Sequence, residues 1–307
     1  EKYISKKDFD LDFMKNHNYT RKKCVSCKSF YWSINPDDTL CGDSPCVNYS
    51  FIGNPPTTKS YNIPEMRDAF LSFFEKHDHG IVKPYPVVAK WRDDLLVTIA
   101  SIVNFQPHIT DGLISPQFNP LVVSQPCLRF DDLEFVGRTA GRHMTIFEMG
   151  GHHAFNLPNK PEIYWKNKTI ELHHEFATKK LGISEDLITY KEHFWVGGGN
   201  AGPDIEGCIL GLEVSTLVFM IYKVLGDKLI KSPVKTVDTG YGIDRWTWLS
   251  QGKNTAFESI YGDLLYKILK WSDINIENKI IRENSMAYTS LSNPAEILKS
   301  KNIVAEK

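Results

Sequence analysis

The sequence predicts an α+β fold, in which helices and strands are combined, with an N-terminal four-cysteine module and a C-terminal helical segment. Two central segments, residues 121–130 and 144–149, have the composition or the alternation of strands. Segments with apolar residues at helical spacing lie before and after them. The third observation is a group of four cysteines near the N-terminus. A chain of 307 residues can bury one large core and carry an appended module.

The loop between the two central strands is polar and carries Asp131, Asp132, Glu134, Arg138, Arg142 and His143. Arg129 lies late in the first strand, and Phe147 lies in the second. An arginine can bind a phosphate through a charge-assisted fork, and an aromatic ring can stack on a base. The segment is therefore suited to clamp a nucleotide. From these residues alone, a surface hairpin with a solvated loop and a core phenylalanine is an equally good interpretation.

The overall charge limits the kinds of partner. A formal net charge of −1 provides no global basic field for nucleic acid, so any RNA contact must use local patches or surfaces outside this chain. The sequence contains no stretch of 18 or more apolar residues and no signal-peptide pattern. Cys127 and Cys208 stand alone, which fits a reducing compartment. We therefore expect a cytoplasmic protein.

The four N-terminal cysteines are spaced as two chelating pairs, Cys24 with Cys27 and Cys41 with Cys46. Two turns with this spacing can present four thiolates to one tetrahedral Zn²⁺. Four thiolates leave no open coordination position, so we expect a structural zinc. Two disulfides or unpaired thiols are the alternatives.

The remaining elements follow from periodicity. A helix is predicted over residues 63–77 behind Pro64, followed by an extended segment over 82–88. A second helix is predicted over 161–181, and strands over 205–210, 212–222 and 234–238. A glycine turn at 239–242 then leads into an amphipathic helix, and the pattern from Ala256 to Lys307 is helical again.

A literal G-x-G-x-x-G occurs at Gly197, Gly199 and Gly202. A dinucleotide-binding fingerprint requires a helix immediately afterwards. Pro203 and strand-like residues follow instead, so that interpretation fails. A glycine loop that lets the backbone approach a small ligand beside Trp195 fits better.

The stretch 120–155 resembles motif 2 of the class II aminoacyl-tRNA synthetases, in the form found in alanyl-tRNA synthetases of the archaeal type. The residues that carry this resemblance are Ser124-Gln125-Pro126, Arg129, Val136-Gly137-Arg138-Thr139, Arg142-His143 and Phe147-Glu148-Met149. Residues 63–88 are similar to motif 1, and residues 234–245 resemble motif 3. The resemblance extends from about Lys22 to about Thr255. It implies the class II fold, an antiparallel sheet flanked by helices. It also implies a zinc module and linker in residues 1–60, a catalytic domain in 61–255 and the start of a helical tRNA-recognition region in 256–307.

The resemblance also implies roles for individual residues in alanine activation with Mg²⁺ and ATP. Arg129 and Arg245 are expected to be catalytic, at the α- and γ-phosphate respectively. The expected ATP-binding set is Arg129, Phe147, Glu148, Arg142, His143, Gly242 and Arg245, and the expected alanine-binding set is Trp195, Thr216, Asp238 and Gly240. Glu213 is a possible Mg²⁺ ligand. Asp244 stands where the family usually has Glu, which puts the placement of Arg245 in question. A turn-capping Asp238 and a core Trp195 are the non-functional alternatives.

The His-x-x-x-His editing signature of the family does not occur in this sequence. Either the chain is a cut piece, or a separate chain carries the remaining tRNA-binding, editing and C-terminal domains. The expected function is therefore ATP-dependent attachment of L-alanine to tRNA(Ala) without editing. A paralogue that passes an activated amino acid to another acceptor, and a non-catalytic zinc-bearing RNA-binding subunit, are the alternatives.

Overall fold

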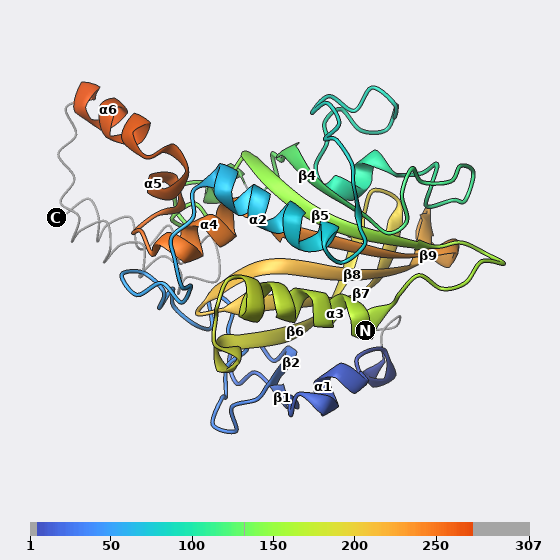
Figure 1. Ribbon diagram of the computed structural model, residues 1–307, viewed down its shortest axis with the longest axis horizontal. Helices are drawn as coiled ribbons and strands as arrows, with labels where there is room; N and C mark the ends of the chain where they lie inside the picture. Colours follow the sequence, from blue (N-terminus) through green and yellow to red (C-terminus); the bar gives the residue numbers. More distant parts are fainter. Residues whose placement is uncertain (1–4, 132, 273–307) are drawn as a thin grey trace.

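In the computed structural model, which describes residues 5–131 and 133–272, one nine-stranded sheet organises the chain (Figure 1). The strand order is β1-β2-β6-β7-β8-β9-β5-β4-β3. Neighbouring strands are antiparallel except β3 and β4, which are parallel. The strands are β1 (Thr20–Lys23), β2 (Phe30–Ser33), β3 (Gly80–Ile81), β4 (Leu121–Leu128), β5 (Ile146–Asn156), β6 (Ile188–Gly197), β7 (Asn200–Ile209), β8 (Leu212–Leu225) and β9 (Lys228–Gly242).

Helices cover one face of this sheet. The helices are α1 (Asp12–Asn16), α2 (Ile63–Glu75), α3 (Lys166–Glu175), α4 (Ile243–Gln251), α5 (Ala256–Tyr261) and α6 (Asp263–Trp271), and α3 continues as a π-helical turn, Phe176–Lys180. Side chains of α2, α3 and α4 share one core with the sheet, including Phe70, Phe176, Tyr241 and Trp246. The described residues contain no helix that is long and apolar enough to cross a membrane.

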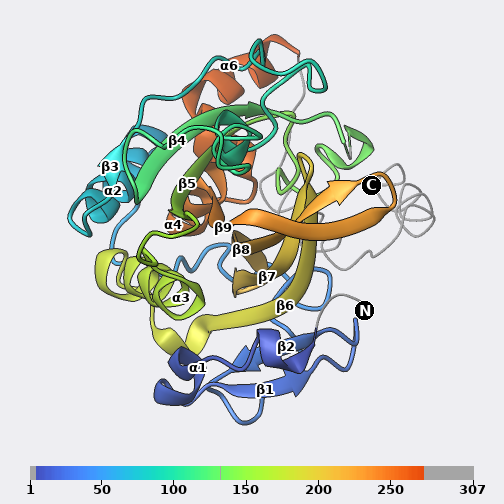
Figure 2. The same cartoon turned by 90° about the vertical axis from the view of Figure 1, so that its right-hand side faces the viewer.

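The opposite face of the sheet has a smaller apolar cluster and leaves room for a site. In β4, Val122 belongs to the helical core, whereas Leu121 and Val123 pack in the second cluster with Ile102 and Phe105. This alternation follows from the two-residue period of a strand. The segment between β3 and β4, which includes a 3₁₀ turn (Ser101–Asn104), covers part of this second face. Figure 2 shows β1 and β2 at one end of the sheet and β4 and β3 at the other.

The structure confirms the α+β class, and the helix predicted at 63–77 is α2. Asn62 accepts a hydrogen bond from the Glu65 amide, and the Glu65 carboxylate accepts one from the Asn62 amide, so a reciprocal capping box begins the helix. The helix predicted at 161–181 begins later, at Lys166. The Asn156 side chain accepts from the Ile163 amide and donates to the Tyr164 carbonyl, which holds the chain before α3 in a non-helical conformation.

The structure defines three local segments more closely than the sequence does. Residues 82–88 form no strand, and the edge strand is the two-residue β3 just before them. No glycine turn separates the last strand from its helix, because β9 runs to Gly242 and α4 begins at the next residue. The glycine-rich segment is a tight hairpin between β6 and β7, with Gly198 and Gly199 at positive φ in the turn.

The predicted domain boundary at residue 60 and the predicted C-terminal helices can each be compared with the structure. The sheet continues across residue 60, since β2 pairs with β6 through Tyr31 and Trp32. The C-terminal segment is helical as far as α6 (Asp263–Trp271). The helical pattern expected over residues 273–307 lies outside the described residues.

Candidate functional site

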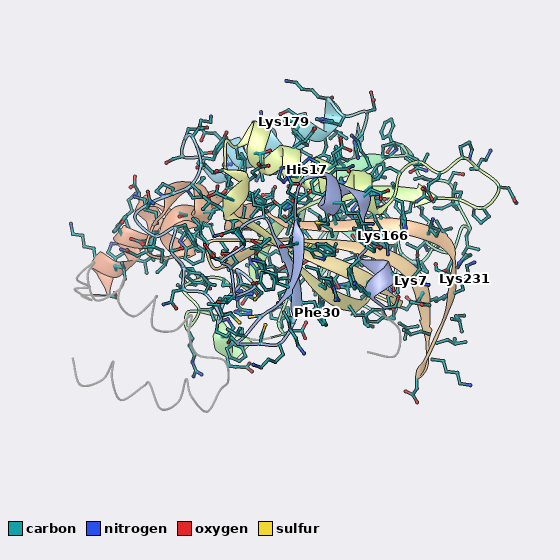
Figure 3. All side chains as sticks on the ribbon, turned by 90° about the horizontal axis from the view of Figure 1, so that it is seen from below. Lys7, His17, Phe30, Lys166, Lys179 and Lys231 are labelled. Carbon is teal, nitrogen blue, oxygen red and sulfur yellow. The ribbon has the colours of Figure 1, made fainter. Side chains whose placement is uncertain are left out.

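A cavity of 440 Å³ opens on the sheet face opposite α2, α3 and α4. Asp238, Gly240 and Gly242 of β9 line it, while Tyr241 between them packs into the helical core. Another groove, of 540 Å³, lies between α1 and α3, where Figure 3 labels His17 and Lys179. That groove contains none of the residues singled out from the sequence. The sheet cavity has the size, the convergent charged groups and the aromatic wall of a small-molecule site, so it is the candidate.

The fold brings eleven residues of the expected site to the sheet cavity. These are Arg129, Arg142, His143, Phe147, Trp195, Glu213, Thr216, Asp238, Gly240, Gly242 and Arg245. Glu148 is not among them, because its neighbours Phe147 and Met149 face the cavity and successive side chains of a strand point to opposite faces. Its carboxylate is paired with Arg67 of α2 and accepts a hydrogen bond from Ser124. The expected ATP contact of Glu148 does not fit this placement.

Arg129 and Phe147 lie together at the end of the β4–β5 hairpin. The Arg129 guanidinium carbon is 5.0 Å from the centroid of the Phe147 ring, and its Nη2 donates to the Ile99 carbonyl at 2.8 Å. Burial lowers the pKa of Arg129 from its ordinary value, but an arginine remains charged at neutral pH. A cation over an aromatic ring is a ready binding surface for a phosphate and a neighbouring planar base.

A second cationic group is formed around Glu213 of β8. Arg245 donates to the Glu213 carboxylate at 3.0 Å, and Arg142 lies 3.8 Å from the same oxygen. Burial raises the pKa of Glu213, but Arg245 and Arg142 outweigh it and bring the pKa to about 2. Thr216 donates to the other oxygen at 2.8 Å. Both carboxylate oxygens therefore accept contacts from protein groups, and the expected role of Glu213 as a Mg²⁺ ligand stays a prediction.

Arg142 is fixed by a residue from the distant N-terminal segment. It forms an ion pair of 2.9 Å with Asp43, which also lies 3.1 Å from Lys191. The neighbouring His143 has its pKa lowered to about 4, first by burial and then by repulsion from Arg245 and Arg142. His143 is thus a neutral hydrogen-bonding group at the cavity wall, with Thr139 as its partner at 3.0 Å.

The other end of the cavity is small and carries an acid. Burial raises the pKa of Asp238 to about 7, because the low-polarity surroundings disfavour the carboxylate. A Cβ at Gly240 would lie 3.2 Å from the Met149 sulfur, so the space there is narrow. The indole of Trp195 packs against Gly197, and Val218 completes the wall. A buried carboxylate beside a narrow apolar space can hold a small molecule with an ammonium group.

Several residues of the cavity region were not found from the sequence. His193 and Glu206 line it from β6 and β7, Asp204 accepts from His193 at 3.0 Å, and Lys191 pairs with Glu206 at 2.7 Å. Each contact crosses between adjacent strands, so the only signal in the sequence was the polarity of these strands at alternating positions. Asp244 accepts from the Glu148 amide at 2.6 Å. It ties the start of α4 to β5, and Arg245 contacts the Glu213 carboxylate.

The Sγ atoms of the four cysteines in the N-terminal module all lie within 4.8 Å of one another. The Cys27 and Cys41 sulfurs are 3.8 Å apart, which is too far for a disulfide. It is the edge expected of a tetrahedron with zinc–sulfur distances of about 2.3 Å. All four cysteines are free, so the disulfide alternative is excluded and the donor set fits one zinc ion.

Comparisons with known proteins point to one family. The family model of the class II (A) tRNA synthetases matches residues 65–297. The chain is 50% identical to the alanine–tRNA ligase of Hyperthermus butylicus over 267 residues, which is 87% of this chain and 29% of that protein. It is 46% identical to the alanine–tRNA ligase of Methanococcus vannielii over 304 residues, covering 98% of this chain and 34% of the relative. The chain therefore spans about a third of the length of these curated relatives.

Proposed function

The chain belongs to the class II (A) tRNA synthetases, and from this membership we propose that it is the catalytic part of an alanine–tRNA ligase. In the proposed reaction, L-alanine is activated with ATP to alanyl-adenylate and pyrophosphate. The alanyl group is then transferred to the 3′ end of tRNA(Ala). The match to alanine–tRNA ligases supports this proposal.

One observation carries the proposal: the sheet cavity has a cationic end and an anionic end. Arg129 and Arg245 lie at the first, with Phe147, and Asp238 lies at the second. ATP bound at the cationic end would place its adenine against Phe147, its α-phosphate at Arg129 and its γ-phosphate at Arg245. Alanine bound through its ammonium to Asp238 would then direct its carboxylate toward the α-phosphate.

Positioning and charge stabilisation would accomplish the first step without a covalent enzyme intermediate. The alanine carboxylate oxygen forms a bond to the α-phosphorus, and the bond to the pyrophosphate oxygen breaks. Arg129 would stabilise the charge that develops on the α-phosphate oxygens. Mg²⁺ bound to ATP supplies further neutralisation of the phosphate charge. We assign that ion mainly to ATP oxygens, with the ionised carboxylate of Glu213 as the candidate protein ligand beside its contacts with Arg245 and Thr216.

Trp195, Gly240 and Thr216 surround the proposed methyl position and give the pocket its selectivity by size. The Thr216 hydroxyl donates to Glu213, so its proton is not free for a substrate. Val218 and Met149 add apolar surface to the same end. A side chain larger than methyl would overlap these groups.

The remaining assignments concern zinc, RNA and the compartment. Cys24, Cys27, Cys41 and Cys46 would hold a structural zinc that stabilises the end of the sheet formed by β1 and β2. We propose tRNA(Ala) as the acceptor and the cytoplasm as the compartment; the relatives contain further sequence outside the matched region. Residues 256–307 are proposed to begin the tRNA-recognition region.

Pyrophosphate exchange measured with each of the twenty amino acids tests this proposal. Exchange that depends on alanine and needs no tRNA is the expected result. Exchange with alanine but transfer to an acceptor other than tRNA would support a paralogue. The absence of exchange with any amino acid would favour a non-catalytic RNA-binding subunit, although that role would leave the cluster of Arg129, Arg245 and Asp238 without a purpose.

A further inference from the structure

His153 lies beside Asp238 but has no part in the proposed chemistry. The two residues are opposite each other on β5 and β9, as the pairing of Ala154 with Val237 requires. The Nδ1 atom of His153 is 3.4 Å from an Asp238 carboxylate oxygen. The His153 side chain is fully buried, packed edge-on against Phe105, and does not reach the cavity surface itself.

Three buried polar atoms around this pair have no hydrogen-bond partner among the described residues. They are Nδ1 and Nε2 of His153 and Oγ of Ser101. A buried polar atom left unpaired is costly, so partners are expected close by. Nε2 of His153 and Oγ of Ser101 both lie close to Gly151. A Cβ atom on Gly151 would be 2.7 Å from His153 Nε2 and 2.3 Å from Ser101 Oγ. The missing side chain of Gly151 leaves space between the serine and the histidine.

We infer that His153 is a positioning residue for the amino-acid site, holding Asp238 by an Nδ1–H···Oδ1 hydrogen bond while Ser101 donates to its Nε2. Since Ser101 Oγ and His153 Nε2 make no direct hydrogen bond in the structure, one buried water carries the second contact. The bond fixes one carboxylate oxygen and leaves the other toward the cavity for an ammonium group. This inference rests on the proposed function, because only that function gives Asp238 a ligand.

The chemistry of the surroundings supports a neutral imidazole in this role. Burial, and then the charge of His79, lower the pKa of His153 to about 3. A neutral imidazole carries one proton, so donating from Nδ1 leaves Nε2 as an acceptor. The carbonyl of Val237 also lies near the ring and is the competing acceptor for the proton. A hydrogen bond to Asp238 favours its charged form, which opposes the effect of burial on that carboxyl.

Nitrogen NMR of the ring provides a test that needs no activity. In the protein without ligands, the ¹⁵N-labelled ring of His153 is expected to be neutral, with its proton on Nδ1. The Asp238→Asn substitution is expected to change the chemical shift of Nδ1. A proton on Nε2, or no response to Asp238→Asn, would overturn the inference. This measurement stands even if the proposed function fails.

The kinetic test uses a matched pair of substitutions. His153→Asn places an amide donor where Nδ1 was, whereas His153→Gln places it where Nε2 was. In alanine-dependent exchange, Gln is expected to raise the KM for alanine about 10- to 100-fold, the loss typical of a hydrogen bond to a charged group. The His153→Asn variant is expected to have a KM for alanine within a few-fold of the wild-type value. The KM for ATP is expected to be unchanged in both variants. Equal effects of Asn and Gln, or equal effects on both substrates, would contradict a positioning role.

His152 is the control for the loss of a buried histidine. It lies on the opposite face of β5, where it contacts the hydroxyls of Tyr164 at 2.8 Å and Tyr241 at 3.3 Å. His152→Asn is expected to lower stability without changing the KM for alanine. A wild-type protein that shows no exchange with alanine would refute the proposed function, and the ring measurement alone would then decide the pairing of His153.

Discussion

Replacing Asp238 by asparagine is expected to make the protein more stable, by an amount that grows with pH. The carboxyl of Asp238 is buried, and its pKa is about 7 against an ordinary value of 3.8. The folded state therefore binds this proton more tightly than the unfolded state does. Between these two values stability falls as pH rises, because unfolding releases a proton. Asparagine has the same shape and no ionisation, so it removes this dependence.

The magnitude follows from the two pKa values. Each pKa unit corresponds to about 1.4 kcal/mol, so the pH-dependent part of the stability difference between Asn and Asp should grow by about 2.5 kcal/mol from pH 5 to pH 8. His153 does not add to this change, since its pKa of about 3 keeps it neutral throughout. Other titrating groups are common to both proteins and cancel in the difference.

The assay is urea unfolding of both proteins at half-unit steps from pH 5 to pH 8. Asp94→Asn is the matched control: Asp94 is exposed, and Arg92 lowers its pKa, so it stays ionised and its difference curve should be flat. A flat curve for Asp238→Asn as well would refute the buried-acid argument. The same variant should lose most of its use of alanine in exchange, which would show that the unfavourable burial of this carboxyl serves binding.

Four further outcomes are expected. Arg129→Ala should slow alanine-dependent exchange by about 100-fold or more, the usual loss when one preorganised charge contact is removed. Arg21→Ala, a control remote from the cavity, should leave the exchange rate unchanged. Near-wild-type exchange by Arg129→Ala would show that Arg129 is not part of the site. Arg245→Ala should raise the KM for ATP more than the KM for alanine, and the reverse would mean that the two subsites are exchanged. Cys41→Ser should reduce the zinc found by elemental analysis and destabilise the module, with Cys127→Ser as the unaffected control. Serine and glycine should be activated at about one-tenth to one two-hundredth of the alanine rate, because a pocket shaped for methyl cannot strongly reject a hydroxyl or a smaller group; rates below about one in ten thousand would show that the pocket is wrongly placed.

The elements that sequence analysis identified correctly are those whose signals are local. Pro64 in the first turn and the helical spacing predict α2, and the alternation in β5 predicts a half-buried strand. The cysteine spacing similarly defines a cluster that needs only two turns to form. The beginning of α3 was misplaced, because the side chain of Asn156 overrides the local preference of residues 161–165.

The sequence by itself determined which chemical groups are available: several arginines, an aromatic ring, a carboxylic acid and four cysteine thiols. Only the tertiary structure decided which of them meet. Strand register turns Glu148 away from the cavity toward Arg67, and it places His153 opposite Asp238. Sheet order brings Asp43, from the cysteine module, to Arg142. These contacts join residues far apart in the chain, and their geometry depends on strand pairing and burial, which no single stretch of sequence specifies.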